Sequence, residues 1–265
     1  MKTLSRSCIG WMGCLSLTAF FFCAQGARAE GLPDPLGLRA SCAAPQPKAD
    51  LDPPIELSPE KLAAEASEFL RRSVAATVVI EVSRCGKKDC GQTKANGTGT
   101  VVSGGGLVLT AFHVVEDASA IKAVFRAVDA DGFLVLTGRV RKATVIAVSP
   151  DKDVALLRLE PDSQPFPHMP IECRWQAGQR SPLWHFGQRS GWSFGRVTFK
   201  TTSSAGIAGV YETDAAALHG DSGGPFVRSS GSLVGILLSI NGAGKSYYMP
   251  AADAVAALEK GIVAR

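Results

Sequence analysis

Short β-rich segments separated by turn signals fill the chain between residues 74 and 250, and this pattern constrains the fold most. Six segments precede residue 160, at 77–82, 98–103, 107–110, 121–126, 133–148 and 154–159. Six more follow a proline-bearing connector, at 181–186, 193–200, 210–213, 225–227, 233–239 and 246–249. Many short strands with turns between them are typical of antiparallel barrels. We therefore predict an all-β protein of two packed barrels, over residues 74–160 and 173–250, joined by a connector at 161–172.

Two helices are predicted outside the barrels. In residues 55–73, the run Ser58-Pro59-Glu60 has the cap, first-turn proline and first-turn acid of a helix start. Over residues 251–265, Val255, Leu258 and Ile262 share one apolar face. Residues 30–54 contain six prolines, so we expect an extended arm there.

The first 29 residues have the pattern of a secretory signal peptide. A basic start with Lys2 and Arg6 precedes a mostly apolar stretch, and Ala27-Arg28-Ala29 is a small-x-small cleavage site. An uncleaved membrane anchor is the alternative, although the stretch is short for a stable span. We expect an exported protein, periplasmic or secreted, with no membrane segment after cleavage.

Removal of this leader changes the charge and the cysteine count. Three of the 28 basic residues and none of the 24 acidic ones lie in it, so the mature chain is nearly neutral. That balance gives no reason to expect a nucleic-acid partner. Four cysteines remain, an even number that favours two disulfides in an exported chain. Cys85 and Cys90 fit a disulfide across a hairpin tip, which leaves Cys42 to pair with Cys173. A zinc site is the rival interpretation, but no histidine lies near these cysteines. Neither a metal nor a cofactor is predicted.

One hexapeptide, Gly220-Asp221-Ser222-Gly223-Gly224-Pro225, surrounds a serine with glycines. A serine nucleophile needs a general base beside it, open space in front of it and N–H groups aimed at the developing oxyanion. Glycine permits the side-chain-free backbone that such an N–H cradle requires. A simple glycine-rich turn is the alternative interpretation.

A histidine and an aspartate lie upstream in suitable settings. His113 follows the apolar run 107–109, and Asp153 opens the strand-like segment 153–157. In the order His113, Asp153, Ser222, these residues predict a base, an orienting acid and a nucleophile, with the N–H groups of Gly220 and Ser222 as the oxyanion hole. Asp151 is a weaker candidate for the acid. The other histidines, His168, His185 and His219, lack the motif context.

These stretches resemble the chymotrypsin-fold serine proteases, and more narrowly their HtrA-type bacterial branch, over roughly residues 74–258. The most specific matches are Gly97-Thr98-Gly99, His113-Val114-Val115, Asp153-Val154-Ala155-Leu156-Leu157 and Thr213-Asp214-Ala215-Ala216. The resemblance implies two six-stranded barrels and a serine endopeptidase acting on polypeptides. No C-terminal PDZ-type module is recognised after the second barrel, although many HtrA-type proteases carry one. The sequence does not indicate the oligomeric state.

Residue 221 departs from the HtrA-type pattern, which usually has Asn there. Trypsin-like enzymes have Asp, which pairs with a new N-terminus after zymogen cleavage. No Ile-Val-Gly-Gly-like start precedes Val74. We therefore expect another partner for Asp221 and no activation by cleavage.

By position, the resemblance places the substrate pocket at Ala216, Ala217, Leu218, Leu238, Ser239, Ile240 and Tyr247. Ala216 stands where trypsin-like enzymes hold a carboxylate, and burying a cation without a counter-charge is costly. Cleavage after small or medium apolar residues is therefore expected. Two other functions remain as alternatives: a catalytically silent binding protein on the same fold, and an esterase. The usual esterase elbow has its histidine last in the chain, whereas His113 comes first here.

Overall fold

The computed structural model describes residues 36–38, 68–85, 90–129, 134–175, 178 and 180–261. The predicted signal peptide lies outside the described residues, as do most of the predicted arm and the start of the first predicted helix. In this part of the chain, no helix is long and apolar enough to cross a membrane.

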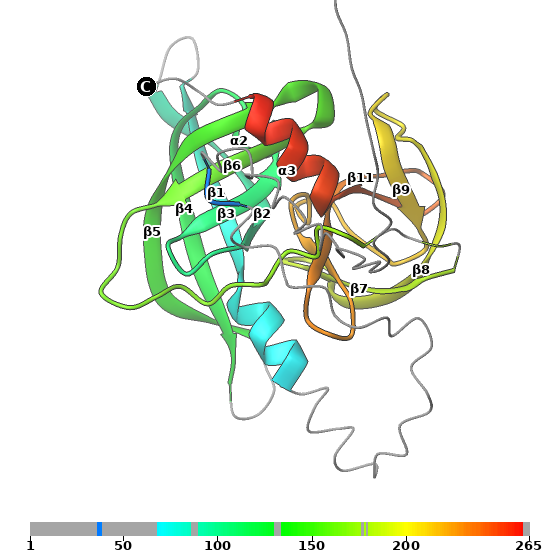
Figure 1. Ribbon diagram of the computed structural model, residues 1–265. Helices are drawn as coiled ribbons and strands as arrows, with labels where there is room; N and C mark the ends of the chain where they lie inside the picture. The colour runs from blue at the N-terminus through cyan, green and yellow to red at the C-terminus, as the bar shows by residue number, and fades with distance from the viewer. Residues whose placement is uncertain are drawn as a thin grey trace, which may run out of the picture. The chain divides into compact units, whose positions relative to one another are not determined.

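The described residues form two closed antiparallel barrels, which confirms the predicted fold class (Figure 1). The first barrel consists of β1 Thr77–Cys85, β2 Cys90–Val101, β3 Leu107–Ala111, β4 Ala118–Val128, β5 Leu134–Ser149 and β6 Val154–Leu159. The second consists of β7 Pro182–Gly187, β8 Gly191–Thr202, β9 Ala208–Thr213, β10 Pro225–Val227, β11 Leu233–Ile240 and β12 Ser246–Pro250. Short helices α2 Phe112–Val115 and η2 Pro150–Lys152 lie in the first half, and α3 Ala251–Lys260 follows the second barrel.

Both barrels have the same strand order. The first runs β1-β2-β3-β6-β5-β4, and the second, taken from β7, runs β7-β8-β9-β12-β11-β10. Each closes by pairing its first strand with its fourth, β1 with β4 and β7 with β10. The sequence shows no corresponding repeat, so two unrelated stretches of chain reach one topology through the same alternation of strands and turns.

Long strands bend to close the first barrel. β5 pairs with β4 through its first part and with β6 through its second, and the β5–β6 register shifts between Val145 and Ala147. Such bulges increase the local bend and twist that barrel closure requires. One long strand therefore serves two neighbours, and its turn into β6 delivers η2 and Asp153 to the end of the barrel.

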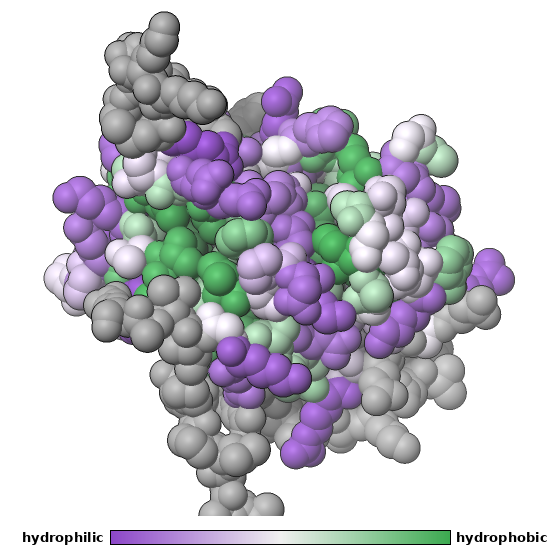
Figure 2. Space-filling model, turned by 90° about the horizontal axis from the view of Figure 1, so that it is seen from above, coloured by the Kyte–Doolittle hydropathy of each residue, from purple (hydrophilic) through white to green (hydrophobic). Residues whose placement is uncertain are grey.

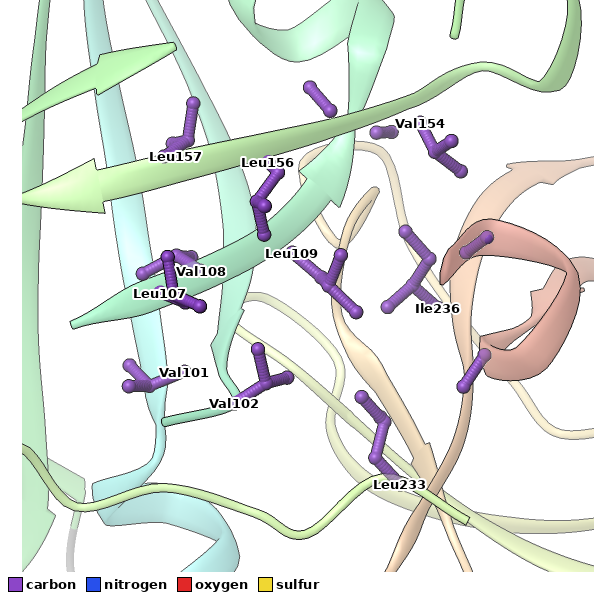
Figure 3. Packing of buried hydrophobic residues seen from close by; sticks show 14 of the residues in the cluster. Val101, Val102, Leu107, Val108, Leu109, Val154, Leu156, Leu157, Leu233 and Ile236 are labelled. Atoms are coloured by element: carbon purple, nitrogen blue, oxygen red, sulfur yellow. The ribbon is translucent and has the colours of Figure 1, made fainter. Parts of the chain in front are cut away.

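An apolar core runs without a break from the first barrel into the second (Figure 3). Leu233 and Ile236 of β11 are fully buried in the same cluster as Leu109 and Leu156 of the first barrel. Burial of one such side chain stabilises the folded state by about 1.5–3 kcal/mol. The apolar contact between the barrels therefore stabilises the fold and helps to hold residues from both halves at fixed positions.

Two helices pack across these barrels. The helix at residues 68–75 places Phe69 against Trp184 and Trp192 of the second barrel, with ring centroids 6.4 and 5.6 Å apart. The buried face of α3 includes Val255 and Leu258, as predicted. α3 ends at Lys260, before the predicted end at residue 265, because Gly261 follows it as the C-cap.

Seen from above, the described surface consists of hydrophilic residues with separate apolar patches between them (Figure 2). The most exposed large apolar side chains include Leu136, Phe199 and Leu218, with exposed fractions of 64%, 50% and 51%. Single exposed apolar residues are ordinary on soluble proteins. Leu218 differs from the other two because it lies beside the predicted catalytic serine.

Candidate active site

A cleft of about 540 Å³ has walls from both barrels and contains the three predicted catalytic side chains. The first half of the chain contributes Phe112, His113, Glu116, Pro150 and Asp153 to its lining. The second half contributes Ala205, Ile207, Leu218, His219, Ser222, Leu237, Leu238, Ser239 and Ile240. Among the described residues, no cluster of three or more metal-ligating side chains occurs.

Asp153 holds His113 by two hydrogen bonds. One carboxylate oxygen, Oδ2, lies 2.8 Å from His113 Nδ1, and the other, Oδ1, accepts a bond of 2.9 Å from the His113 backbone N–H. A carboxylate at Nδ1 fixes that nitrogen as the proton donor, which leaves Nε2 free to accept a proton. The orientation of His113 is therefore the one that a general base requires.

The turn before β6 explains why Asp153, and not Asp151, faces the histidine. Asp153 ends η2 with φ 52°, a left-handed conformation that carboxylate and amide residues tolerate best, and it is 9% exposed. Its backbone oxygen accepts a 3.0 Å bond from Phe112 N–H. Asp151 is exposed and accepts a 2.7 Å bond from the Ser149 hydroxyl, which lowers the pKa of the Asp151 carboxyl.

Ser222 lines the same cleft, but its hydroxyl does not bond to the histidine. Ser222 Oγ donates to the Leu238 backbone oxygen at 3.4 Å. Catalytic hydrogen bonds are often long or misaligned without substrate and tighten only in the complex. A rotation about χ1 is the motion that would turn this hydroxyl from Leu238 towards the imidazole.

Two backbone N–H groups beside Ser222 lack a protein acceptor. Within the described residues, neither the Gly220 N–H nor the Ser222 N–H donates to any protein atom. Gly220 has φ +99°, a conformation that a side chain would strain. Both residues are partly exposed at the cleft, so the two N–H groups are available to an acceptor that enters it.

β2 of the first barrel fixes the backbone of the serine loop. Thr98 N–H donates to the Ser222 oxygen at 2.8 Å, and Thr98 Oγ1 donates to the Gly220 oxygen at 3.0 Å. A side chain on Gly223 would place its Cβ 2.1 Å from the Thr98 oxygen. The close approach of the two barrels therefore explains the glycine at position 223.

Asp221 is fully buried and binds backbone N–H groups. Its carboxylate accepts bonds from the N–H groups of Arg189 at 2.7 Å, Ser190 at 3.2 Å and Leu218 at 2.8 Å. These bonds tie the loop before Ser222 to the β7–β8 turn. Asp221 thus has an internal partner, as expected from the absence of a zymogen-type N-terminus.

Two further side chains support this turn, and the sequence patterns gave no sign of them. Gln188 Nε2 donates to the Gly220 oxygen at 2.7 Å, and Arg126 of β4 donates to the Gln188 oxygen at 3.0 Å. Burial lowers the pKa of the Arg126 guanidinium, while the nearby Asp221 charge opposes that shift. The Gly220 carbonyl is therefore held from two sides, by Thr98 and by Gln188.

His185 lies in the core near Asp221 and outside the cleft lining. It is fully buried, its Nδ1 lies 3.1 Å from the Pro225 oxygen, and its ring stacks on Phe226. Burial lowers the pKa of His185 to about 4, although the Asp221 charge favours protonation. His185 is therefore a neutral core residue, whereas the exposed His219 lines the cleft.

Four of the seven predicted pocket residues line the cleft, namely Leu218, Leu238, Ser239 and Ile240. Ala216, Ala217 and Tyr247 do not. The Tyr247 hydroxyl accepts from Asn241 Nδ2 at 2.9 Å and donates to Glu212 at 3.2 Å. The difference arises because β12 turns Tyr247 towards its register partner Glu212 on β9.

The two closed six-stranded barrels, with a cleft between them, form the fold of the trypsin-like peptidases. The chain belongs to the family described as the trypsin-like peptidase domain, whose model matches residues 97–236.

Among curated relatives, a probable periplasmic serine endoprotease, DegP-like, from Chlamydia muridarum is 29% identical over 149 residues, which are 54% of this chain and 28% of the relative. A putative serine protease, HhoB, from Synechocystis is 27% identical over 158 residues, 56% of this chain and 35% of the relative. The chain thus spans little more than a third of these relatives at most. The predicted resemblance to HtrA-type proteases is confirmed.

The fold also matches a solved structure. An HtrA-type protease, AlgW, determined with a tripeptide, aligns with a TM-score of 0.54 at 20% identity, covering 70% of this chain and 59% of that one. At this identity the likeness concerns the fold alone, and it agrees with the two six-stranded barrels described above.

Proposed function

We propose that this protein is a serine endopeptidase that hydrolyses polypeptides through an acyl-enzyme on Ser222. The observation that carries this proposal is the pair of hydrogen bonds between Asp153 and His113, in the cleft that also contains Ser222. Membership of a trypsin-like peptidase family supports the same reaction class.

The proposed reaction follows from the roles of these groups. His113 Nε2 takes the Ser222 Oγ proton as Oγ attacks the scissile carbonyl carbon, and the oxyanion binds the Gly220 and Ser222 N–H groups. Collapse breaks the C–N bond, and the imidazolium gives its proton to the leaving amine. A water, deprotonated by His113, then attacks the ester carbonyl. The bond from that carbon to Ser222 Oγ breaks, Oγ takes the proton back from the imidazolium, and the acid is released.

The lining of the cleft supports an apolar residue on the acyl side of the cleaved bond. Leu218, Leu238 and Ile240 line the cleft together with Ser222. The predicted pocket base is an alanine, Ala216, which offers no carboxylate to pair with a Lys or Arg side chain. A substrate side chain that differs by one methylene changes the binding free energy in an apolar pocket by only about 1–3 kcal/mol, so the preference among apolar residues is broad. Ser239 Oγ, buried without a partner among the described groups, adds a polar contact to this lining.

We further propose that the chain is exported and oxidised. Two observations support export: the first 29 residues have the pattern of a signal peptide, and a relative is described as periplasmic.

Cys173 is disulfide-bonded, but Cys42 lies outside the described residues, so the pairing of Cys42 with Cys173 stays a prediction. Cys85 and Cys90 are direct register partners at the ends of β1 and β2, which supports the second proposed disulfide. Thiol titration of exported protein tests both, and four free thiols would contradict them.

Labelling with a serine-directed fluorophosphonate tests the proposed reaction. Peptide mapping of wild-type protein should place the label on Ser222, and Ser222→Ala should lose the label and about 10⁶-fold in turnover, as in a comparable triad enzyme. A folded wild-type protein that takes no label would indicate a silent binding protein. Label on Ser222 with ester but no peptide hydrolysis would indicate an esterase.

A further inference from the structure

The helix that carries His113 is too short to hold its own position. α2 spans four residues, Phe112–Val115, and its N-cap residue makes no side-chain hydrogen bond. Isolated helices of this length are unstable in water, and the last carbonyls of a helix lack partners within it. Only the Phe112 oxygen is bonded within the turn, by Glu116 N–H at 2.9 Å.

Arg84 supplies the missing donors. Its Nε donates to the Glu116 oxygen at 2.9 Å, and its Nη2 donates to the oxygens of His113 and Val114, each at 3.1 Å. A cation at the C-terminal end of a helix also interacts favourably with the helix dipole. One guanidinium therefore spans three carbonyls of the turn.

The sheet directs Arg84 to this place. The register of β1 shifts at Arg84 against both neighbours, between Arg84 and Cys85 on the β2 side and between Ser83 and Arg84 on the β4 side. Such irregularities re-aim a side chain. In the described part of the chain, all the hydrogen bonds of the Arg84 side chain go to backbone oxygens of α2 and of its C-cap residue, Glu116.

The result is a histidine held from two opposite sides. Asp153 binds the His113 backbone N–H and ring Nδ1, and Arg84 binds the His113 backbone oxygen. Below the turn, Val114 packs where Gly97 of β2 lacks a side chain, since a Cβ there would lie 2.4 Å from Val114 Cγ1. Without Arg84, the C-terminal side of the turn loses its only polar anchor among the described residues.

We propose that Arg84 is a positioning residue that sets the distance and angle between His113 and Ser222, a role that rests on the function proposed above. The planar fork of arginine suits three carbonyls at once, whereas a lysine ammonium is a point donor on a flexible stem. A misplacement of about 1 Å can cost about 10²-fold in rate even when the changed residue is remote from the chemistry.

Steady-state kinetics on a peptide substrate with Arg84→Met and Arg84→Lys test this role. We expect kcat to fall about 10–100-fold in Arg84→Met, with KM nearly unchanged, and Arg84→Lys to recover only part of the loss. The matched control is Arg158→Met, which removes an exposed arginine of β6 that makes no described side-chain bond. A kcat of Arg84→Met equal to that of the wild-type protein would overturn the proposal.

A spectroscopic readout separates this proposal from the proposed function. The His113 Nδ1 proton, shared with Asp153, should give a low-field proton resonance that shifts or broadens in Arg84→Met but not in Arg158→Met. If wild-type protein is inactive yet this change is seen, the peptidase function fails and the role of Arg84 stands. An unchanged resonance overturns that role. Unfolding of both Arg84 variants, measured by circular dichroism, would also overturn it in favour of a purely structural contact.

Discussion

The Asp221 carboxylate occupies the space that a side chain on Gly187 would need. A Cβ atom built on Gly187 would lie 2.2 Å from Asp221 Cγ and 2.4 Å from both carboxylate oxygens. Because that carboxylate is buried and bonded to three backbone N–H groups, it has no room to retreat. The glycine at the end of β7 therefore determines whether the loop before Ser222 keeps its shape.

Gly187→Ala should consequently lower kcat with little change in the His113–Asp153 pair. Displacement of Asp221 moves Leu218 and with it the Gly220 N–H, and loss of one oxyanion donor costs about 10²–10³-fold. Steady-state kinetics measure the effect. Gly242→Ala is the control, because no atom lies within 4 Å of its added Cβ. Normal kcat in folded Gly187→Ala would contradict the proposed oxyanion hole.

Asp153→Asn should keep the fold and lose about 10⁴-fold in rate, because the amide no longer selects the productive imidazole tautomer. Asp151→Asn should leave the rate unchanged, since the Asp151 carboxylate is bound to Ser149 and faces solvent. The comparison needs only kcat/KM for the two variants. The reverse ranking would transfer the orienting role to Asp151.

Stability should fall as the pH drops from about 6.5 towards about 4, in part because of His185. Burial lowers the pKa of this histidine from 6.5 to about 4, so in that window the unfolded chain binds a proton that the folded chain does not. The stability lost to His185 is on the order of 1–3 kcal/mol. Urea unfolding at several pH values should show a smaller pH slope for His185→Gln than for wild type. His219→Gln, an exposed change, should keep the wild-type slope, and equal slopes in all three proteins would contradict the prediction.

A peptide library scored by the residue on the acyl side of each cleaved bond should show Val, Ala and Leu ahead of Lys and Arg. The cleft residues near Ser222 are largely apolar, and an unpaired cation buried against them costs several kcal/mol. Leu238→Asp should raise the relative cleavage after Lys or Arg. Dominant cleavage after basic residues in the wild-type protein would contradict the apolar assignment.

The barrels were predictable because local signals repeat along the chain. Segments such as 107–110 and 154–159 are apolar and β-rich, and they became β3 and β6, buried at nearly every position. His113, Asp153 and Ser222 each stand in a motif of their own, so the sequence could place all three in one site, and they line one cleft. Turn signals located most strand ends to within a few residues. β2 and β4 extend beyond the predicted segments because each continues its antiparallel pairing towards a hairpin, β2 with β1 and β4 with β5.

The supports of the site were not predictable, because they depend on register between distant strands. Arg84 reaches α2 only through shifts in β1 pairing, and Gln188 and Arg126 come from opposite barrels. No local pattern marks such residues. Tyr247 lies outside the cleft lining for the same reason, since its direction is set by pairing with Glu212.

α3 packs on the first barrel although it follows the second barrel in the sequence, so part of the packing of the first barrel forms only late in synthesis. α3 contacts β5 and β6 although it follows the last strand of the second barrel, and the Val148 N–H donates to the Gly261 oxygen at 3.1 Å. Ala254 and Leu258 are fully buried in the core that the first barrel shares. A nascent chain that has emerged only as far as residue 250 therefore lacks α3, and the apolar surface of the first barrel that α3 covers stays exposed until residues 251–260 have been made.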